Sequence, residues 1–140
     1  MSRCRDPSRC QYPDVIGAEH PHEKPSADLL ERIGAGAVEA IIDAEMLQEL
    51  LHRYRTIGRW ETASKVYGLT RRLFPMVLPV TAEIMDEAHD LMDCYHNLMA
   101  RDGVRAAVVR LHDLDAICSY DRAFDVIAGL QRVEPDAILA

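Results

Sequence analysis

Two aspartates, Asp102 and Asp121, have positions that suit a binding site better than the core of a globular protein. Asp102 opens a predicted helix that is apolar on almost every side, so its carboxylate should face protein or a cleft rather than open water. Asp121 follows a strand-like run over residues 114–118, and ligands bind at the carboxyl ends of strands in open parallel sheets. Either acid alone is better explained by a helix dipole or a turn, but the two in this order favour a site.

A third acid, Glu49, lies in a predicted helix that follows directly after a buried strand over residues 38–42. Glu45 and Glu49 are one helical turn apart, and such a pair is most often a solvated helix face. The place of Glu49 just after the carboxyl end of a strand makes it the stronger candidate of the two.

The elements that must position these acids alternate between strands and helices. Helices are predicted from Ser26, after residue 42, over residues 60–73 and after Thr81, and the helix of Asp102 follows. Further strands are predicted near residues 76–80 and 130–133, and Pro79 should confine the first of these to a sheet edge because proline lacks an N–H donor. This alternation predicts an α/β fold with a mainly parallel sheet.

Composition and charge limit the classes of function. Apolar residues make up 49% of the 140 residues, charged residues 28% and aromatic residues 6%, and the net charge is −7. The acidic balance argues against broad coating of nucleic acid, and the few aromatics argue against base-stacking platforms. No apolar run approaches a membrane span, so no membrane partner is expected. Four cysteines without framework spacing indicate reduced thiols and a cytoplasmic location.

Residues 1–24 are interpreted as an irregular or disordered lead, and residues 25–140 as the folded domain. Prolines at positions 7, 13, 21 and 25 interrupt this first stretch, and it has no run of β-branched residues. Four side chains in it are potential zinc ligands, but their spacing matches no common zinc finger. They are Cys4, Cys10, His20 and His22.

One basic island lies between residues 52 and 72 of this acidic chain. Such an island is usually a solvated surface, and the sharper alternative is a surface that contacts phosphate groups. Its members are Arg53, Arg55, Arg59, Lys65, Arg71 and Arg72, opposed only by Glu61.

Taken together, these stretches resemble the PIN-domain family, and within it the bacterial VapC-type toxin ribonucleases. The likeness rests on ARD at residues 100–102 with the Ala-rich helix after it, on ICSYD at 117–121 and on FD at 124–125. It extends to residues 44–54 and 77–81, and so covers the chain from about residue 17 to its end. The order and spacing of these motifs are more specific than any one of them.

The resemblance implies a three-layer fold with helices on both faces of the sheet and an acidic cluster at its carboxyl edge. Glu49, Asp102 and Asp121 match the second, third and fourth acids of the family, which makes them the expected catalytic and metal-binding residues. Asp125 is an expected auxiliary metal ligand, and Ser119 matches a hydroxyl position beside the last acid. Carboxylate ligands select Mg²⁺ or Mn²⁺, which activates water for phosphodiester hydrolysis. The implied partners are an RNA substrate, a cognate antitoxin and a second copy of the chain.

The start of the chain departs from the family. The family begins with an apolar strand that ends in Asp-x-Asn and forms the middle of the sheet, whereas residues 12–16 are a poor match and Asp6 and Asp14 are weak substitutes. A degenerate or absent first strand is therefore predicted, from a truncated or frame-shifted gene start or from loss of the strand, and complete loss of this middle strand would expose two sheet edges. Two functions follow: a metal-dependent ribonuclease toxin, or an inactive or truncated PIN-domain protein that acts only by binding a partner.

Overall fold

The sheet of this protein is parallel throughout. The structure is a computed structural model that describes residues 10–11, 23–37 and 40–139. Five strands lie in the order β3 (Met76–Leu78), β2 (Ile41–Asp43), β1 (Cys10–Gln11), β4 (Ala116–Cys118), β5 (Arg132–Val133). All four pairings are parallel, which confirms the predicted sheet. The chain winds outward from β1 to one side and then continues on the other, so the strand order reverses between β1 and β4, the usual place for a ligand site.

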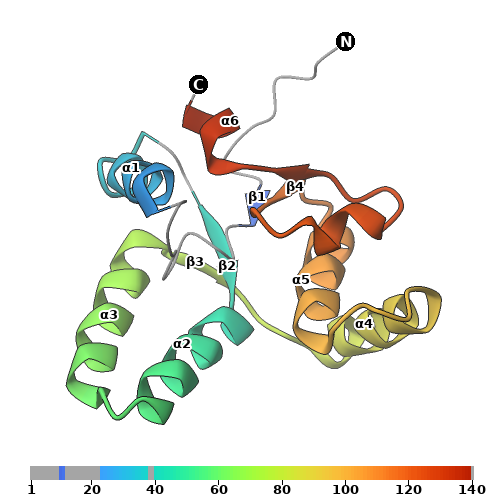
Figure 1. Cartoon of the computed structure of the whole chain (residues 1–140), viewed down its shortest axis with the longest axis horizontal. Coiled ribbons are helices and arrows are strands. Elements are labelled where there is room, and N and C mark those ends of the chain that lie inside the picture. The colour runs from blue at the N-terminus through green and yellow to red at the C-terminus, as the bar shows by residue number, and fades with distance from the viewer. Residues whose placement is uncertain (1–9, 12–22, 38–39, 140) are drawn as a thin grey trace.

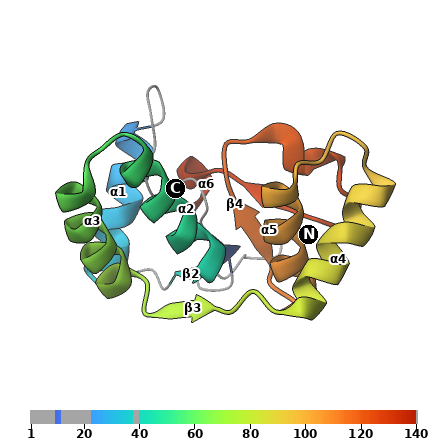
Figure 2. The same cartoon turned by 90° about the horizontal axis from the view of Figure 1, so that it is seen from below.

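Helices cover both faces of the sheet and complete three layers (Figures 1 and 2). One face carries α1 (Glu23–Gly34), α2 (Ala44–Thr56), α3 (Trp60–Leu73) and α6 (Pro135–Leu139), and the other carries α4 (Ala82–Cys94) and α5 (Ala100–Leu111). Strand β4 shows why two cores form. Ala116 and Cys118 belong to the first core and Ile117 to the second, because successive side chains of a strand point to opposite faces.

The first strand is present but very short. Gln11 pairs with Ile41 of β2 on one side and with Ile117 of β4 on the other, so β1 occupies the middle of the sheet. The first strand is therefore reduced rather than absent. The two edges that its loss would expose are not present, because β1 separates β2 from β4. Residues 12–16, Asp6, Cys4, His20 and His22 lie outside the described residues, and Cys10 is described only as a backbone position of β1.

The predicted domain boundary stays a prediction. It was placed between residues 24 and 25, a position that falls inside α1, and β1 precedes it in the chain. The prediction that Ser26 begins the first helix is wrong, since α1 begins at Glu23. Pro25 is accommodated there because the first turn of a helix has no intrahelical partner for its N–H groups.

Several local predictions agree with the structure. Strand β3 lies at the edge of the sheet, as Pro79 requires, and β5 forms within residues 130–133 as expected. Thr81 caps α4 by accepting a hydrogen bond from the Ile84 N–H at 3.4 Å. The short helix α6 was not predicted, because five residues are too few to show a helical period.

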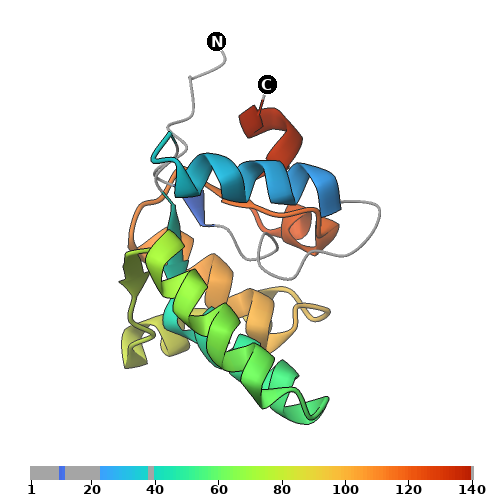
Figure 3. The same ribbon diagram turned by 90° about the vertical axis from the view of Figure 1, so that its left-hand side faces the viewer.

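Helices α2 and α3 form a hairpin that extends away from α1 (Figure 3). The basic island lies on this hairpin and its turn, and its arginines are exposed. Arg55 stacks on the half-exposed ring of Trp60 at 3.9 Å from the ring centre. Among the described helices, none has the length and apolarity needed to cross a membrane.

Candidate metal centre

A buried ionic cluster lies at the carboxyl edge of the sheet, beside the reversal of strand order. Asp43 is the last residue of β2 and the N-cap of α2, where its Oδ1 accepts a hydrogen bond from the Met46 N–H at 3.0 Å. It is fully buried. The cap fixes where α2 begins, and α2 then carries Glu45 and Glu49 toward α5, which carries Asp102.

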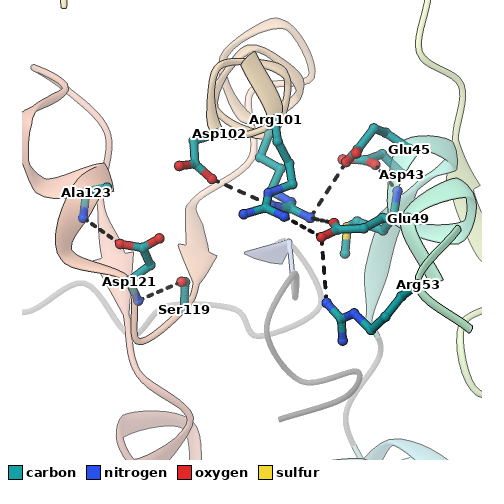
Figure 4. Close-up of polar contacts among 11 residues, drawn as sticks. Asp43, Glu45, Glu49, Arg53, Arg101, Asp102, Ser119, Asp121 and Ala123 are labelled. Carbon is teal, nitrogen blue, oxygen red and sulfur yellow. Dashed lines mark hydrogen bonds and ion pairs between the residues drawn. The ribbon is translucent and has the colours of Figure 1, made fainter. Parts of the chain in front are cut away.

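Arg105 joins the two helices. Its Nη2 lies 2.5 Å from Oε2 of Glu49 and 3.6 Å from Oε2 of Glu45, and its Nη1 lies 3.6 Å from Oδ1 of Asp102. Arg101 adds a second donor, with its Nη1 2.5 Å from Oε1 of Glu49. Figure 4 shows Asp102 on one side of Arg101 and Glu45 and Glu49 on the other. Three carboxylates from two helices therefore surround one guanidinium.

Burial and charge act differently on the two glutamates. Burial opposes ionisation of Glu49, but Arg105 and Arg101 outweigh it and hold the pKa of Glu49 below its ordinary value. Burial raises the pKa of Glu45, and the nearby Asp43 and Glu49 add to this rise while Arg105 opposes it. Of these two glutamates, Glu45 is therefore the one whose negative charge the folded state compensates less.

This difference predicts opposite effects of one substitution on the metal-free protein. The raised pKa of Glu45 means that its ionised form opposes folding at neutral pH, so Glu45→Gln should raise the Tm there. The gain should vanish below the ordinary value of 4.5. The lowered pKa of Glu49 means that its ionised form stabilises the fold, a contribution lost as pH falls through the lowered value. Glu49→Gln should therefore lower the Tm at neutral pH.

Thermal melts of both variants and the wild type in EDTA, at several pH values between about 3 and 8, measure both effects. The two variants serve as matched controls, because they make the same change one turn apart on α2. Shifts of the same sign at neutral pH would contradict the assignment.

Asp121 lies beyond the end of β4, apart from the ionic cluster of Glu45, Glu49 and Arg101 (Figure 4). It is exposed, and its Oδ1 accepts a hydrogen bond from the Ala123 N–H at 2.9 Å as the cap of a 3₁₀ turn over Arg122–Val126. Oγ of the fully buried Ser119 accepts a hydrogen bond from the Asp121 N–H at 2.9 Å. Ser119 therefore fixes the backbone that presents Asp121.

Asp125 meets an arginine. Its Oδ1 and Oδ2 lie 2.8 and 3.3 Å from Nε and Nη2 of Arg132, which also contacts Glu134 at 3.0 Å. The hydrogen bond from Arg132 lowers the pKa of Asp125. Its role as an auxiliary metal ligand stays a prediction, and this ion pair would have to open for it.

The structure brings Glu49 and Asp102 to one guanidinium, but it does not gather the four predicted ligands at one point. Within the described part of the chain, the one group of at least three possible ligand atoms within 4.8 Å of one another is His89, Asp90 and Asp93. These side chains are exposed on α4. Electrostatics explains why the predicted ligands stay apart. Carboxylates repel one another, and the positive charge between Glu49 and Asp102 comes from Arg105.

The donor set at the cluster nevertheless fits Mg²⁺ or Mn²⁺. Glu45, Glu49 and Asp102 offer hard carboxylate oxygens, the ligands that these ions prefer. One of these oxygens, Oε2 of Glu45, is buried and accepts no hydrogen bond. A buried acceptor without a donor is costly, and a cation would satisfy it.

Two members of the cluster escaped the sequence analysis. Asp43 directly follows the apolar pair at residues 41–42 and precedes a helix, which is the signature of an N-cap at a strand end. Arg105 is the one charged residue between Asp102 and Arg110 in a helix that is otherwise apolar, and it lies one turn after Asp102. Both features can be seen in the sequence, but neither shows which residues Asp43 and Arg105 will contact in the fold.

Comparison with known proteins gives consistent relatives. The PIN domain family matches residues 14–130. The chain is 35% identical over 119 residues to VapC ribonuclease Mb1869c of Mycobacterium bovis and to Ribonuclease VapC13 of Mycobacterium tuberculosis, covering 85% of this chain and 91% of each relative.

Ribonuclease VapC7 of Mycobacterium tuberculosis is 31% identical over 126 residues, covering 86% of this chain and 84% of the relative. No solved structure matches the chain. The parallel sheet and the carboxylates at its carboxyl edge agree with this match over most of the chain. The protein therefore belongs to the PIN-domain family of VapC-type proteins.

Proposed function

We propose that this protein is a metal-dependent ribonuclease, the toxin component of a type II toxin–antitoxin system, and that its partners are an RNA substrate and a cognate antitoxin. The observation that carries the proposal is the convergence of Glu49 and Asp102, from two helices, at the carboxyl edge where the strand order reverses. The relatives named as ribonucleases support it. A homodimer and a cytoplasmic location remain predictions.

The proposed ligands of Mg²⁺ or Mn²⁺ are Glu49, Asp102 and Asp121, with Asp125 as an auxiliary. When bound, the ion supplies activation of water and charge stabilisation for phosphodiester hydrolysis. The chain supplies position. Asp43 fixes the start of α2 and so the place of Glu49, and Ser119 fixes the turn that presents Asp121.

Cleavage of RNA by the full chain in Mg²⁺, with EDTA as the negative control, tests the proposal. With only three of the family's acids matched, the activity of this chain is expected to be weak or absent. Any cleavage that it shows should depend on the metal and disappear in Asp121→Ala, whose exposed side chain can be removed without opening a cavity. Metal-independent cleavage, or equal cleavage by Asp121→Ala, would contradict the proposal.

The basic island on the α2–α3 hairpin is the proposed contact for RNA phosphates. Reversal of Arg53 and Arg59 to Glu should weaken RNA binding and reduce the slope of log affinity against log salt by about 1.4 for a single strand, the value for two lost contacts. Fluorescence anisotropy at several salt concentrations measures the slope. An unchanged slope would assign these two arginines to surface solvation.

The double reversal of Arg71 and Arg72 is the matched control. These residues lie in the last turn of α3, at the other end of the hairpin from its tip, and their reversal changes the net charge equally. A smaller effect than that of Arg53 and Arg59 would place the contact at the tip of the hairpin, whereas equal effects would extend it over the whole basic island.

A second candidate function is partner binding without catalysis. The observation that favours it is that Arg101 and Arg105 already neutralise Glu49, so the fold does not depend on a metal to compensate this carboxylate. The Arg53/Arg59 reversal also tests this candidate. Loss of antitoxin binding with RNA binding intact, in a chain that cleaves no RNA, would favour it.

A further inference from the structure

Arg105 occupies an unusual place for an arginine. Its side chain is only 7% exposed, and it extends from the apolar helix α5 into the space between α2 and α5. Three carboxylates lie within 3.6 Å of its terminal nitrogens. A buried charge needs such compensation, because transfer from water to a protein interior is costly for an ion.

The three carboxylates balance the charge of Arg105, but they do not satisfy all of its hydrogen-bond donors. The contact with Glu49 is a short hydrogen bond, whereas those with Glu45 and Asp102 are ion pairs at 3.6 Å. Nε of Arg105 and Oε2 of Glu45 are both buried without a hydrogen-bond partner. Since unsatisfied buried groups carry a free-energy cost, this arrangement can exchange for another that satisfies the same carboxylates.

We propose that Arg105 is a built-in competitor of the metal: its guanidinium holds Glu45, Glu49 and Asp102 together in the metal-free protein and must release Glu49 before a divalent cation binds. This inference rests on the proposed function, because it concerns the same metal site. Oε2 of Glu49, the atom that Arg105 binds, belongs to a proposed ligand, so the arginine and the cation compete for one carboxylate. Arg101, which is half exposed, keeps a contact with the other oxygen of Glu49 during the exchange.

The competition predicts the effect of removing the charge. Arg105→Met keeps an unbranched apolar side chain in the buried position and removes the guanidinium. Mn²⁺ affinity, measured by calorimetry on the full chain, should then rise at least about tenfold, within the range of ordinary coupling between two binding events. The Tm of this variant in EDTA should fall, because the carboxylates lose their cation, and saturating Mn²⁺ should restore it.

Two controls separate charge from shape and position. Arg105→Lys keeps the charge, so its Mn²⁺ affinity should stay close to that of the wild type. Arg110→Met makes the same change later on α5, where the half-exposed Arg110 contacts Glu87 at 3.4 Å, and it should leave the affinity unchanged. If Arg105→Met does not fold, Arg101→Met replaces it. This variant removes the closer of the two exposed arginine contacts to Oε1 of Glu49, the other being Arg53 at 3.6 Å, and should raise the affinity by a smaller factor.

The outcomes distinguish this inference from the proposed function. Binding by the wild type with equal or weaker binding by folded Arg105→Met would overturn the competition and leave the metal site standing, and weaker binding would make Arg105 a residue that positions Glu49 for the ion. An unchanged affinity in Arg101→Met, where that variant is the one measured, would also overturn it. Absence of Mn²⁺ binding in wild type and variants alike would overturn both the metal site and the inference.

Discussion

Replacement of residues 1–16 by an apolar strand that ends in Asp-x-Asn is expected to raise Mg²⁺-dependent RNA cleavage by about 100-fold or more. Strand β1 lies between β2 and β4, so the carboxyl end of a longer strand in this place would lead to the edge that carries Asp43 and Ser119. An added carboxylate there would supply the first acidic ligand of the family, which is not identified in this sequence. A bound metal contributes several kcal/mol to transition-state stabilisation, and about 1.4 kcal/mol corresponds to a factor of ten in rate.

The matched control carries the same strand with Asn-x-Asn in place of Asp-x-Asn. It gives β1 the same added length without the carboxylate, so it should improve stability but not cleavage. Initial rates on one RNA under one Mg²⁺ concentration compare the three proteins. Full Mg²⁺-dependent cleavage by the unmodified chain, abolished by Asp121→Ala, would show that the added acid is not needed.

Asp102→Asn is expected to weaken Mn²⁺ binding by roughly 10–100-fold or more, because even the loss of a residue that only orients a metal ligand usually costs about this much. The substitution keeps the size of a side chain that is 9% exposed, so it should open no cavity in the fold. It removes the charge that lies 3.6 Å from Arg105, and with it one hard anionic ligand. Calorimetric titration of the full chain with Mn²⁺ measures the change.

Asp86→Asn is the control for this variant. Asp86 is an exposed carboxylate on α4, outside the ionic cluster, and its loss should leave Mn²⁺ affinity unchanged. Equal affinity in wild type and Asp102→Asn would remove Asp102 from the site. A similar loss in both variants would point to a general effect of net charge.

The sequence by itself determined the elements and most of the candidate acids. The alternation of strand and helix patterns predicted the parallel sheet, and Pro79 predicted that β3 lies at its edge. The apolar surroundings of Asp102 predicted its burial, which the structure confirms. These features depend on residues close together in the chain, where the strand and helix periods and the chemistry of proline act directly.

Local sequence patterns predict burial less well where the exposure of a side chain depends on neighbouring elements of the fold. Met85 and Leu111 fall on the apolar stripes of α4 and α5, yet they are 46% and 50% exposed. A helical period shows which residues share a face, but it does not show how far the covering elements extend over that face. The packing of α4 against α5 leaves these two positions outside the shared core.

The tertiary structure alone decided which charges meet. Glu49 binds Arg101 and Arg105, which lie 52 and 56 residues later in the sequence. Asp125 forms a hydrogen bond with Arg132. No period or motif encodes such pairs, because they arise only when the sheet brings α2 beside α5. The sequence identified carboxylates that could hold a metal, and the fold placed an arginine among them, since buried like charges require a cation from whichever element packs nearest.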